Sequence, residues 1–278
     1  MIGQTDLKSL IASLKDRNKW PHFVLIVGDE GSGKKTICKE FFPQAAWIDD
    51  ITADGVRKML EVVYTTRDAL FVIPDADEMS QNAQNELLKV IEECPNNSSF
   101  IMTIKNEANI LSTIKSRAML LHMSSYYKKE LEAYYDSISD DAEHRDMVIS
   151  VCSVPGDVKQ LLSYGAERFY NYVAIVAECI ATVSGSNVFK IGTKLAVARD
   201  AEGYDLRLFW KAFASIVRDK MMEAYFTEND YNKATAYQGV IEVTDKFLQI
   251  LRKKGINKQM LLDRWILEVR EILMPYVD

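Results

Sequence analysis

Cysteine and histidine are scarce in this sequence. Its 278 residues include four cysteines and three histidines. The cysteines are far apart and form no C-x-x-C pair, and the histidines show no metal-ligand spacing. We therefore expect no zinc site and no disulfide framework, and we predict buried free thiols at Cys38, Cys94, Cys152 and Cys179.

Long apolar runs are also lacking. None reaches the roughly 20 residues that a transmembrane helix needs, and the first six residues have no apolar signal-peptide core. The sequence thus predicts a cytoplasmic protein without a membrane partner. An excess of positive charge is absent as well: the net charge of −6 argues against a protein that coats nucleic acid by charge alone.

Size and composition indicate a globular protein of more than one compact part. A chain of 278 residues is too long for one small core, and 48% hydrophobic with 27% charged residues is ordinary for a globular protein. Apolar runs alternate with helical patterns through residue 123, and helical patterns dominate from residue 124 onward. We predict an α/β domain with a mostly parallel sheet, followed by helices. The expected strands are 22–27, 46–48, 69–73, 99–104 and 119–123.

The most informative stretch is glycine-rich and lies between the first expected strand and a helix. The pattern G-x-x-x-x-G-K is complete from Gly28 to Lys34. In such a loop the glycines let backbone N–H groups face phosphate oxygens, and the lysine reaches the outer phosphates. We predict that ATP or ADP binds here. The residues expected to hold it are Gly28, Gly31, Ser32, Gly33, Lys34, Lys35 and Thr36.

The position that normally binds Mg²⁺ in this loop is altered. A serine or threonine hydroxyl is expected directly after Lys34, but Lys35 stands there. Thr36 comes one residue late and should point about 100° away around the helix. The loop is therefore suited to a triphosphate but lacks its metal ligand.

The acidic strand end carries a second alteration. In nucleoside-triphosphate hydrolases of this kind, one carboxylate helps to hold Mg²⁺ and the next orients the attacking water. Here Pro74 takes the first position and Asp75 the second. Proline cannot ligate a metal, so a bound Mg²⁺ is doubtful and Asp75 is the residual catalytic position. Alternatively, the acidic residues after residue 74 only end a strand and start a helix.

Thr103 completes the candidate residues that the sequence patterns indicate in the α/β domain. Thr103 lies at the end of the fourth expected strand, where a threonine can sense a γ-phosphate or simply satisfy backbone groups.

A short helix is expected over 107–115. Further helices are expected at 128–138, 142–152 and 157–164, and helical patterns continue through 167–278.

Several motifs together resemble the clamp-loader subunits of the AAA+ class, most closely the delta-prime subunits of bacterial DNA polymerase III and their phage relatives. The likeness covers residues 1–165 well and the remainder only by architecture. The family has a Ser-Arg-Cys motif where this chain has Ser116, Arg117 and Ala118, so alanine replaces the usual cysteine. Lys159 stands where ATPase members of the family tend to carry arginine. The matching segments are Ile2–Gln4, Trp20–Leu25, Ala76–Ser80, Asn85–Pro95, Thr113–Ala118 and Pro155–Lys159.

The resemblance implies three domains. They are a RecA-like AAA+ nucleotide-binding domain over 1–123, a small helical lid over 124–166 and an all-α collar domain over 167–278. It also implies a hetero-pentamer of clamp-loader subunits that loads a sliding clamp on primed DNA. In this family Arg117 would be an arginine finger given in trans to a neighbour's ATP, and Lys159 would contact nucleotide from the lid.

Two alternatives stay open at this level. The chain could be an active, gamma/tau-like clamp-loader ATPase in which Thr36 or water replaces the missing metal ligand and Asp75 acts as base. It could also be an unrelated P-loop kinase, which predicts an acceptor pocket and leaves the helical tail unexplained. Delta-prime subunits tend to have silent ATP sites, so the two alterations favour a subunit that does not hydrolyse ATP by itself.

Overall fold

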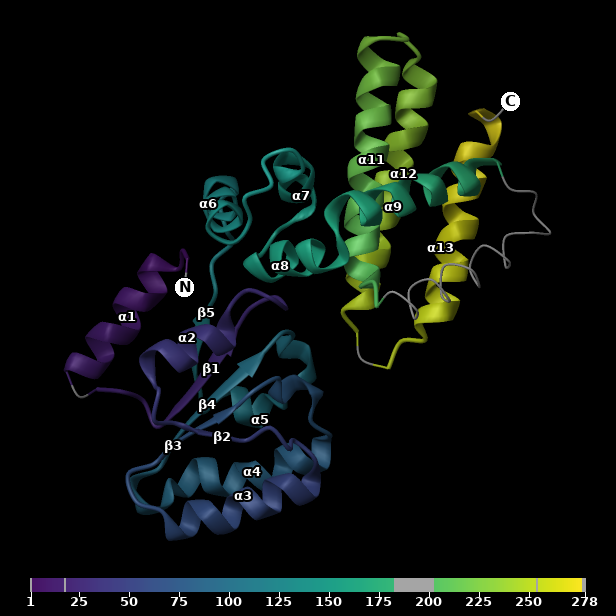
Figure 1. Cartoon of the computed structure of the whole chain (residues 1–278). Helices are drawn as coiled ribbons and strands as arrows, with labels where there is room; N and C mark the ends of the chain where they lie inside the picture. The colour runs from purple at the N-terminus through teal and green to yellow at the C-terminus, as the bar shows by residue number, and fades with distance from the viewer. Residues whose placement is uncertain (1, 18, 183–202, 254, 277–278) are drawn as a thin grey trace. The chain divides into compact units, whose positions relative to one another are not determined.

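The first compact unit comprises residues 1–130 and 154–156 and is built around a parallel sheet. The structure, a computed structural model, describes residues 2–17, 19–182, 203–253 and 255–276. Every strand pairing is parallel, in the order β2-β3-β4-β1-β5 (Figure 1). The predicted α/β fold is confirmed, and the carboxyl ends of all five strands lie at one edge. The strands are β1 (Phe23–Val27), β2 (Ala46–Trp47), β3 (Leu70–Ile73), β4 (Ser99–Ile104) and β5 (Met119–His122).

Helices cover both faces of this sheet (Figure 1). Successive side chains of a strand point to opposite faces, so β1 contributes to two cores. Phe23 and Leu25 join one core with α3 and α4, while Val24 and Ile26 join the other with α1 and α2. The helices of this unit are α1 (Thr5–Asp16), α2 (Lys34–Phe41), α3 (Ala53–Thr65), α4 (Gln81–Glu93) and α5 (Ser112–Lys115), with 3₁₀ turns η1 (Ala76–Glu78), η2 (Pro95–Asn97) and η3 (Glu107–Asn109).

The helix expected over 107–115 is instead two short pieces. Asn106 caps the turn η3, because its side-chain oxygen accepts a hydrogen bond from the N–H of Ala108. Ile110 then takes an extended conformation that buries its side chain in the sheet core, and α5 begins two residues later. Burial of one isoleucine thus interrupts the helical pattern.

The second compact unit comprises residues 131–153 and 157–278 and is helical throughout its described part. The last predicted lid helix begins two residues early, because Pro155 fits the first turn of a helix, where its missing N–H is not needed. The predicted helical stretch 183–202 lies outside the described residues, and the division into separate lid and collar domains stays a prediction. The helices are α6 (Lys128–Ile138), α7 (Arg145–Val151), α8 (Pro155–Tyr164), α9 (Ala166–Thr182), α11 (Leu206–Phe226), α12 (Tyr231–Leu251) and α13 (Lys258–Leu273), with a closing turn η5 (Met274–Tyr276).

An aromatic cluster forms the core of this second unit. The indole ring of Trp265 packs edge-on against Phe213 and Phe209 and lies 5.7 Å from the ring of Trp210. The indole N–H of Trp265 donates to the hydroxyl of Thr244 at 3.1 Å, so its one polar atom is satisfied within the core. These contacts join α11, α12 and α13.

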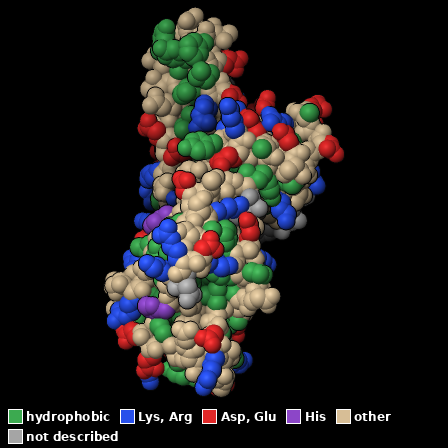
Figure 2. Space-filling model, turned by 90° about the vertical axis from the view of Figure 1, so that its left-hand side faces the viewer, with side chains coloured by type: hydrophobic (Ala, Val, Ile, Leu, Met, Phe, Trp, Pro, Cys, Tyr) green, Lys and Arg blue, Asp and Glu red, His purple; other side chains and the backbone are tan. Residues whose placement is uncertain are grey.

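Hydrophobic side chains also gather on the surface at the end of the α11–α12 hairpin (Figure 2). Tyr225, Phe226 and Tyr231 are exposed there, and the ring of Tyr225 contacts each of the other two edge-to-face. Nowhere in the described ranges does a helix combine the length and the apolar character needed to cross a bilayer.

The prediction of four buried thiols is wrong in part. Cys38 is buried, Cys94 and Cys152 are half-buried, and Cys179 is exposed. The cause is the position of Cys179 on α9, whose buried face carries Val176 and Ile180 and leaves the thiol on the outside.

Candidate nucleotide-binding site

The glycine-rich loop connects β1 to α2 at the carboxyl edge of the sheet. Gly31 and Gly33 have φ angles of 76° and 95°, which only glycine adopts without strain. A Cβ atom on Gly28 would lie 2.6 Å from Cγ of Met123. The sequence therefore folds into this turn because glycine occupies the three positions where a side chain would clash or strain the backbone.

Two hydrogen bonds from distant residues fix the loop. The hydroxyl of Tyr126 donates to the carbonyl of Ser32 at 2.7 Å, and the N–H of Gly156 donates to the carbonyl of Gly31 at 3.0 Å. A Cβ atom on Gly156 would lie 2.4 Å from Cα of Gly31, so the two backbones pack directly against each other. Neither partner was identified from the sequence, because both contacts join segments more than 90 residues apart.

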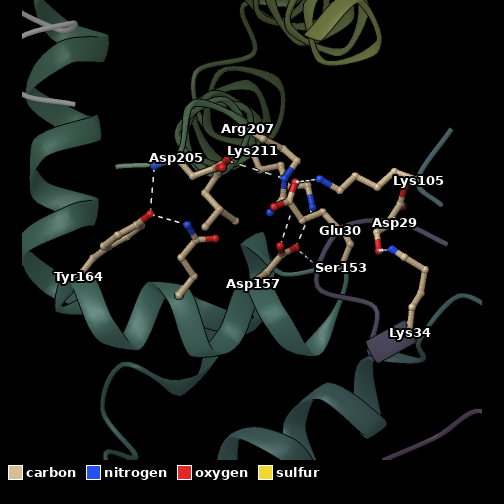
Figure 3. A network of polar contacts seen from close by, with 12 residues as sticks. Asp29, Glu30, Lys34, Lys105, Ser153, Asp157, Tyr164, Asp205, Arg207 and Lys211 are labelled. Atoms are coloured by element: carbon tan, nitrogen blue, oxygen red, sulfur yellow. Dashed lines mark hydrogen bonds and ion pairs between the residues drawn. The ribbon is translucent and has the colours of Figure 1, made fainter. Parts of the chain in front are cut away.

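Lys34 is the buried cation of the loop. Its ammonium donates to the carbonyl oxygens of Gly28 at 2.6 Å and Asp29 at 2.8 Å, and Figure 3 shows the second of these bonds. Burial lowers the pKa of the Lys34 ammonium, while the charge of Asp75 acts in the opposite direction. A phosphate oxygen could replace one of these carbonyls as the acceptor and would give the Lys34 ammonium a negatively charged partner.

The loop fits a phosphate group. Ser32 is 2% exposed, and its buried hydroxyl has no hydrogen-bond partner in the described part of the chain. The first turn of α2 begins at Lys34, and its N–H groups have no acceptor within the helix. An unpartnered hydroxyl, free helix-terminal donors and a buried ammonium are the groups that a nucleotide phosphate accepts from. The residues Gly28 to Lys34 could thus hold a nucleoside di- or triphosphate, which would supply a transferable phosphoryl group.

Lys35 and Asp75 form an ion pair across the neighbouring part of the site. The Lys35 ammonium lies 2.7 Å from Oδ2 of Asp75, and their side chains are 53% and 24% exposed. Asp75 adopts a left-handed conformation directly after β3. Its backbone N–H donates to the hydroxyl of Thr103 at 3.1 Å. The sequence thus places Lys35, Asp75 and Thr103 correctly at one edge but does not reveal that the first two are paired.

These residues do not fit a magnesium ion. Mg²⁺ requires oxygen ligands in octahedral geometry, and an ammonium offers none. Pro74 is buried and has no donor atom in its side chain, and Thr36 is exposed. In the residues that the structure describes, no three His, Cys, Asp or Glu side chains converge as a metal site.

More charged groups surround the ion pair. Lys105 lies 2.9 Å from a carboxylate oxygen of Glu78 and 3.5 Å from one of Glu30. Asp77 is buried and accepts a hydrogen bond from the N–H of Asn106 through Oδ2, while its Oδ1 has no partner in the described ranges. Carboxylates and lysines thus alternate around the loop.

Arg117 lies just after α5. Its guanidinium lies 2.5 Å from a carboxylate oxygen of Glu92 on α4 and donates to the carbonyl of Thr113 at 2.7 Å. The side chain is 38% exposed. Lys159 is exposed on α8, in the second unit. The roles of Arg117 and Lys159 toward nucleotide stay predictions.

The sheet order and the loop together define the class of protein. A glycine-rich loop after β1, an acidic residue after β3 and a threonine on the strand between them, in the order β2-β3-β4-β1-β5, are the arrangement of an AAA+ fold. A crystal structure of a DNA polymerase III gamma subunit-related protein from Thermotoga maritima shares the fold. Its TM-score is 0.52 at 16% identity, with 95% of this chain and 99% of that chain covered.

Sequence comparisons show which kind of AAA+ protein the chain resembles. A family model described as "DNA polymerase III, delta subunit" matches residues 46–126. The replication factor C small subunit of Halobacterium salinarum is 23% identical over 59% of this chain and 57% of its own length. Replication factor C subunit 3 of Schizosaccharomyces pombe is 24% identical over 95% of this chain and 79% of its own length. The chain thus spans less than two thirds of the first of these relatives. The predicted resemblance to AAA+ clamp-loader subunits is confirmed.

Proposed function

We propose that this chain is a clamp-loader subunit of DNA replication. It assembles with related AAA+ subunits into a hetero-pentamer, which loads a sliding clamp on primed DNA. The observation that carries the proposal is the alignment with the Schizosaccharomyces pombe subunit, because it runs through 95% of the chain and so includes both compact units. A kinase with an unrelated helical tail would have no reason to match over that length.

The subunit is of the delta-prime type and does not hydrolyse ATP by itself. Its phosphate loop holds ATP or ADP, and its metal position is degenerate. The ion pair between Lys35 and Asp75 supports this assignment, because the one carboxylate that could orient water is engaged with an ammonium. The same pair counts against the gamma/tau-like alternative, in which Asp75 acts as a base.

The catalytic contribution of the subunit is Arg117. In the assembly, this arginine reaches the γ-phosphate bound by a neighbouring subunit and stabilises charge in the transition state, an effect of about 10³–10⁵ in rate in other phosphoryl-transfer systems. Its exposure and its place after α5 support the role, and the ion pair with Glu92 keeps it ordered until it engages. The helices of residues 167–278 form the collar contacts, and the protein acts in the cytoplasm.

Co-purification tests the assembly. The full chain is co-expressed with the clamp-loader subunits of its own source and analysed by size exclusion and native mass spectrometry. We expect a five-subunit particle that contains this chain. A chain that elutes alone in the presence of all those subunits would contradict the proposal.

A further inference from the structure

The ion pair of Lys35 lies where a metal ion would bridge two elements. Lys35 is the second residue of α2, next to the lysine of the phosphate loop. Asp75 follows β3 directly. A metal in a P-loop site is held by a hydroxyl at the position of Lys35 and by a carboxylate at the strand end, where this chain has Pro74, the residue before Asp75. Lys35 and Asp75, which flank that metal position, are instead in direct contact at 2.7 Å.

The length of the lysine side chain explains the direct contact. A serine or threonine hydroxyl at position 35 is short and leaves a space that a metal and its waters fill. The ammonium stands four atoms further from the backbone than the Cβ atom, so Lys35 spans this space and brings a positive charge to its far side. The charge has the sign of the missing metal and needs no oxygen ligands.

The carboxylate partner is held in place by the backbone. The N–H of Asp75 donates to Thr103, and its carbonyl accepts from the N–H of Glu78 at 2.9 Å. A fixed Asp75 carboxylate close to the loop would repel a phosphate if it were unpaired. Lys35 neutralises it, so Lys34 and the N–H groups of α2 face the ligand without an opposing charge.

We propose that Lys35 is a built-in replacement for the magnesium ion, and that the loop binds a metal-free nucleoside di- or triphosphate. This inference rests on the nucleotide site of the proposed function and deepens it by specifying the ionic form of the ligand. Magnesium competes with the protein for the phosphate oxygens in this arrangement. Binding is therefore at least as tight in its absence.

Calorimetry with ADP and ATP tests the inference on the full-length protein. Each nucleotide is titrated in excess EDTA and again in excess Mg²⁺. For the wild-type protein we expect equal or tighter binding in EDTA. Lys35→Thr restores the hydroxyl, and its affinity should become at least about tenfold weaker in EDTA than in Mg²⁺. Lys39→Thr is the matched control, because Lys39 is exposed on the same helix and lies over the ring of Trp47 instead.

Two results would overturn the inference. One is a wild-type affinity that is about tenfold or more weaker in EDTA than in Mg²⁺. The other is no binding of either nucleotide in either buffer. Neither result touches the proposed assembly, because the co-purification described above reads assembly and requires no nucleotide, although the absence of binding would also remove the nucleotide from the proposed function. A second variant, Asp75→Asn, should strengthen binding in EDTA, since it frees the Lys35 ammonium for phosphate.

Discussion

The Lys35 ammonium and the Asp75 carboxylate lie 2.7 Å apart at the centre of the candidate site. A carboxylate that is engaged with an ammonium is not free to orient an attacking water. We therefore expect the isolated protein to release no phosphate from ATP in Mg²⁺ above the level of its Lys34→Ala variant. Turnover that Lys34→Ala abolishes would instead indicate an active ATPase subunit.

Asp157 should be important for the stability of the second unit. Its carboxylate is fully buried and accepts from Arg207, from Lys211 at 2.8 Å and from the N–H of Ser153 at 3.0 Å (Figure 3). Removing one member of a buried ion pair costs about 3–5 kcal/mol, and the partial exposure of both cations places Asp157→Ala near the lower value. Urea denaturation measures the loss.

An exposed ion pair provides the control for that variant. Asp54 contacts Arg57 at 3.0 Å with its side chain 81% exposed. Exposed pairs contribute about 0–1 kcal/mol, so Asp54→Asn should change the free energy of unfolding by less than about 1 kcal/mol. Equal effects of Asp157→Ala and Asp54→Asn would show that the buried cluster is not stabilising.

Two glycines should respond oppositely to alanine. A Cβ atom on Gly156 would lie 2.4 Å from Cα of Gly31, and backbone cannot move aside cheaply. Overpacking of this kind costs about 1–3 kcal/mol, so Gly156→Ala should destabilise the protein and weaken nucleotide binding. Gly239 lies within α12, where an added Cβ would meet only Ile272 at 3.7 Å. Gly239→Ala should stabilise by about 0.5–1 kcal/mol. Thermal unfolding distinguishes the two, and equal shifts of one sign would refute the explanation.

Local sequence patterns predicted the strands and most helices. The β1 run Phe23–Val27 is apolar at every position and buried at every position, as a strand covered on both faces requires. Capping residues act equally locally: the side chains of Thr52 and Ser80 accept from N–H groups three residues later, at the starts of α3 and α4. Strands and helix starts depend on residues that are close in the sequence, so a local sequence pattern can predict them.

Partners of the site residues could not be predicted in the same way. The sequence identified Lys35 as a missing metal ligand, but its pairing with Asp75 depends on how β3 and α2 meet across β4. Tyr126 is held to the loop by a contact over 94 residues that leaves no local signal. The sequence left two roles open for Thr103, contact with a γ-phosphate or a hydrogen bond to the backbone. The structure shows the second, because the hydroxyl of Thr103 accepts from the backbone N–H of Asp75.

The pKa of His144, in the second unit, should depend on its hydrogen bond with Asp141. Asp141 forms a hydrogen bond to Nδ1 of His144 at 2.8 Å, which raises the pKa of His144 above 6.5 and lowers the pKa of Asp141. The stabilisation from His144 is complete below its unfolded pKa and is lost as pH rises through its folded pKa. The contribution of Asp141 is lost as pH falls through its own lowered pKa.

NMR titration of the His144 ring checks this pairing. We expect the midpoint to move down in Asp141→Asn and to stay unchanged in Asp140→Asn, which removes the adjacent carboxylate and leaves the hydrogen bond in place. An unchanged midpoint in Asp141→Asn would exclude the pairing.

The most direct test of the proposed role is ATP turnover by the reconstituted assembly carrying Arg117→Ala. Arg57→Ala is the matched control, because Arg57 is also an exposed arginine of the first unit paired with a glutamate of α4. We expect both variants to assemble normally. Turnover at the site served by Arg117 should fall by about 10³ or more, while Arg57→Ala keeps wild-type turnover. Unchanged turnover in an intact Arg117→Ala assembly would contradict the role of this chain as the donor of an arginine finger.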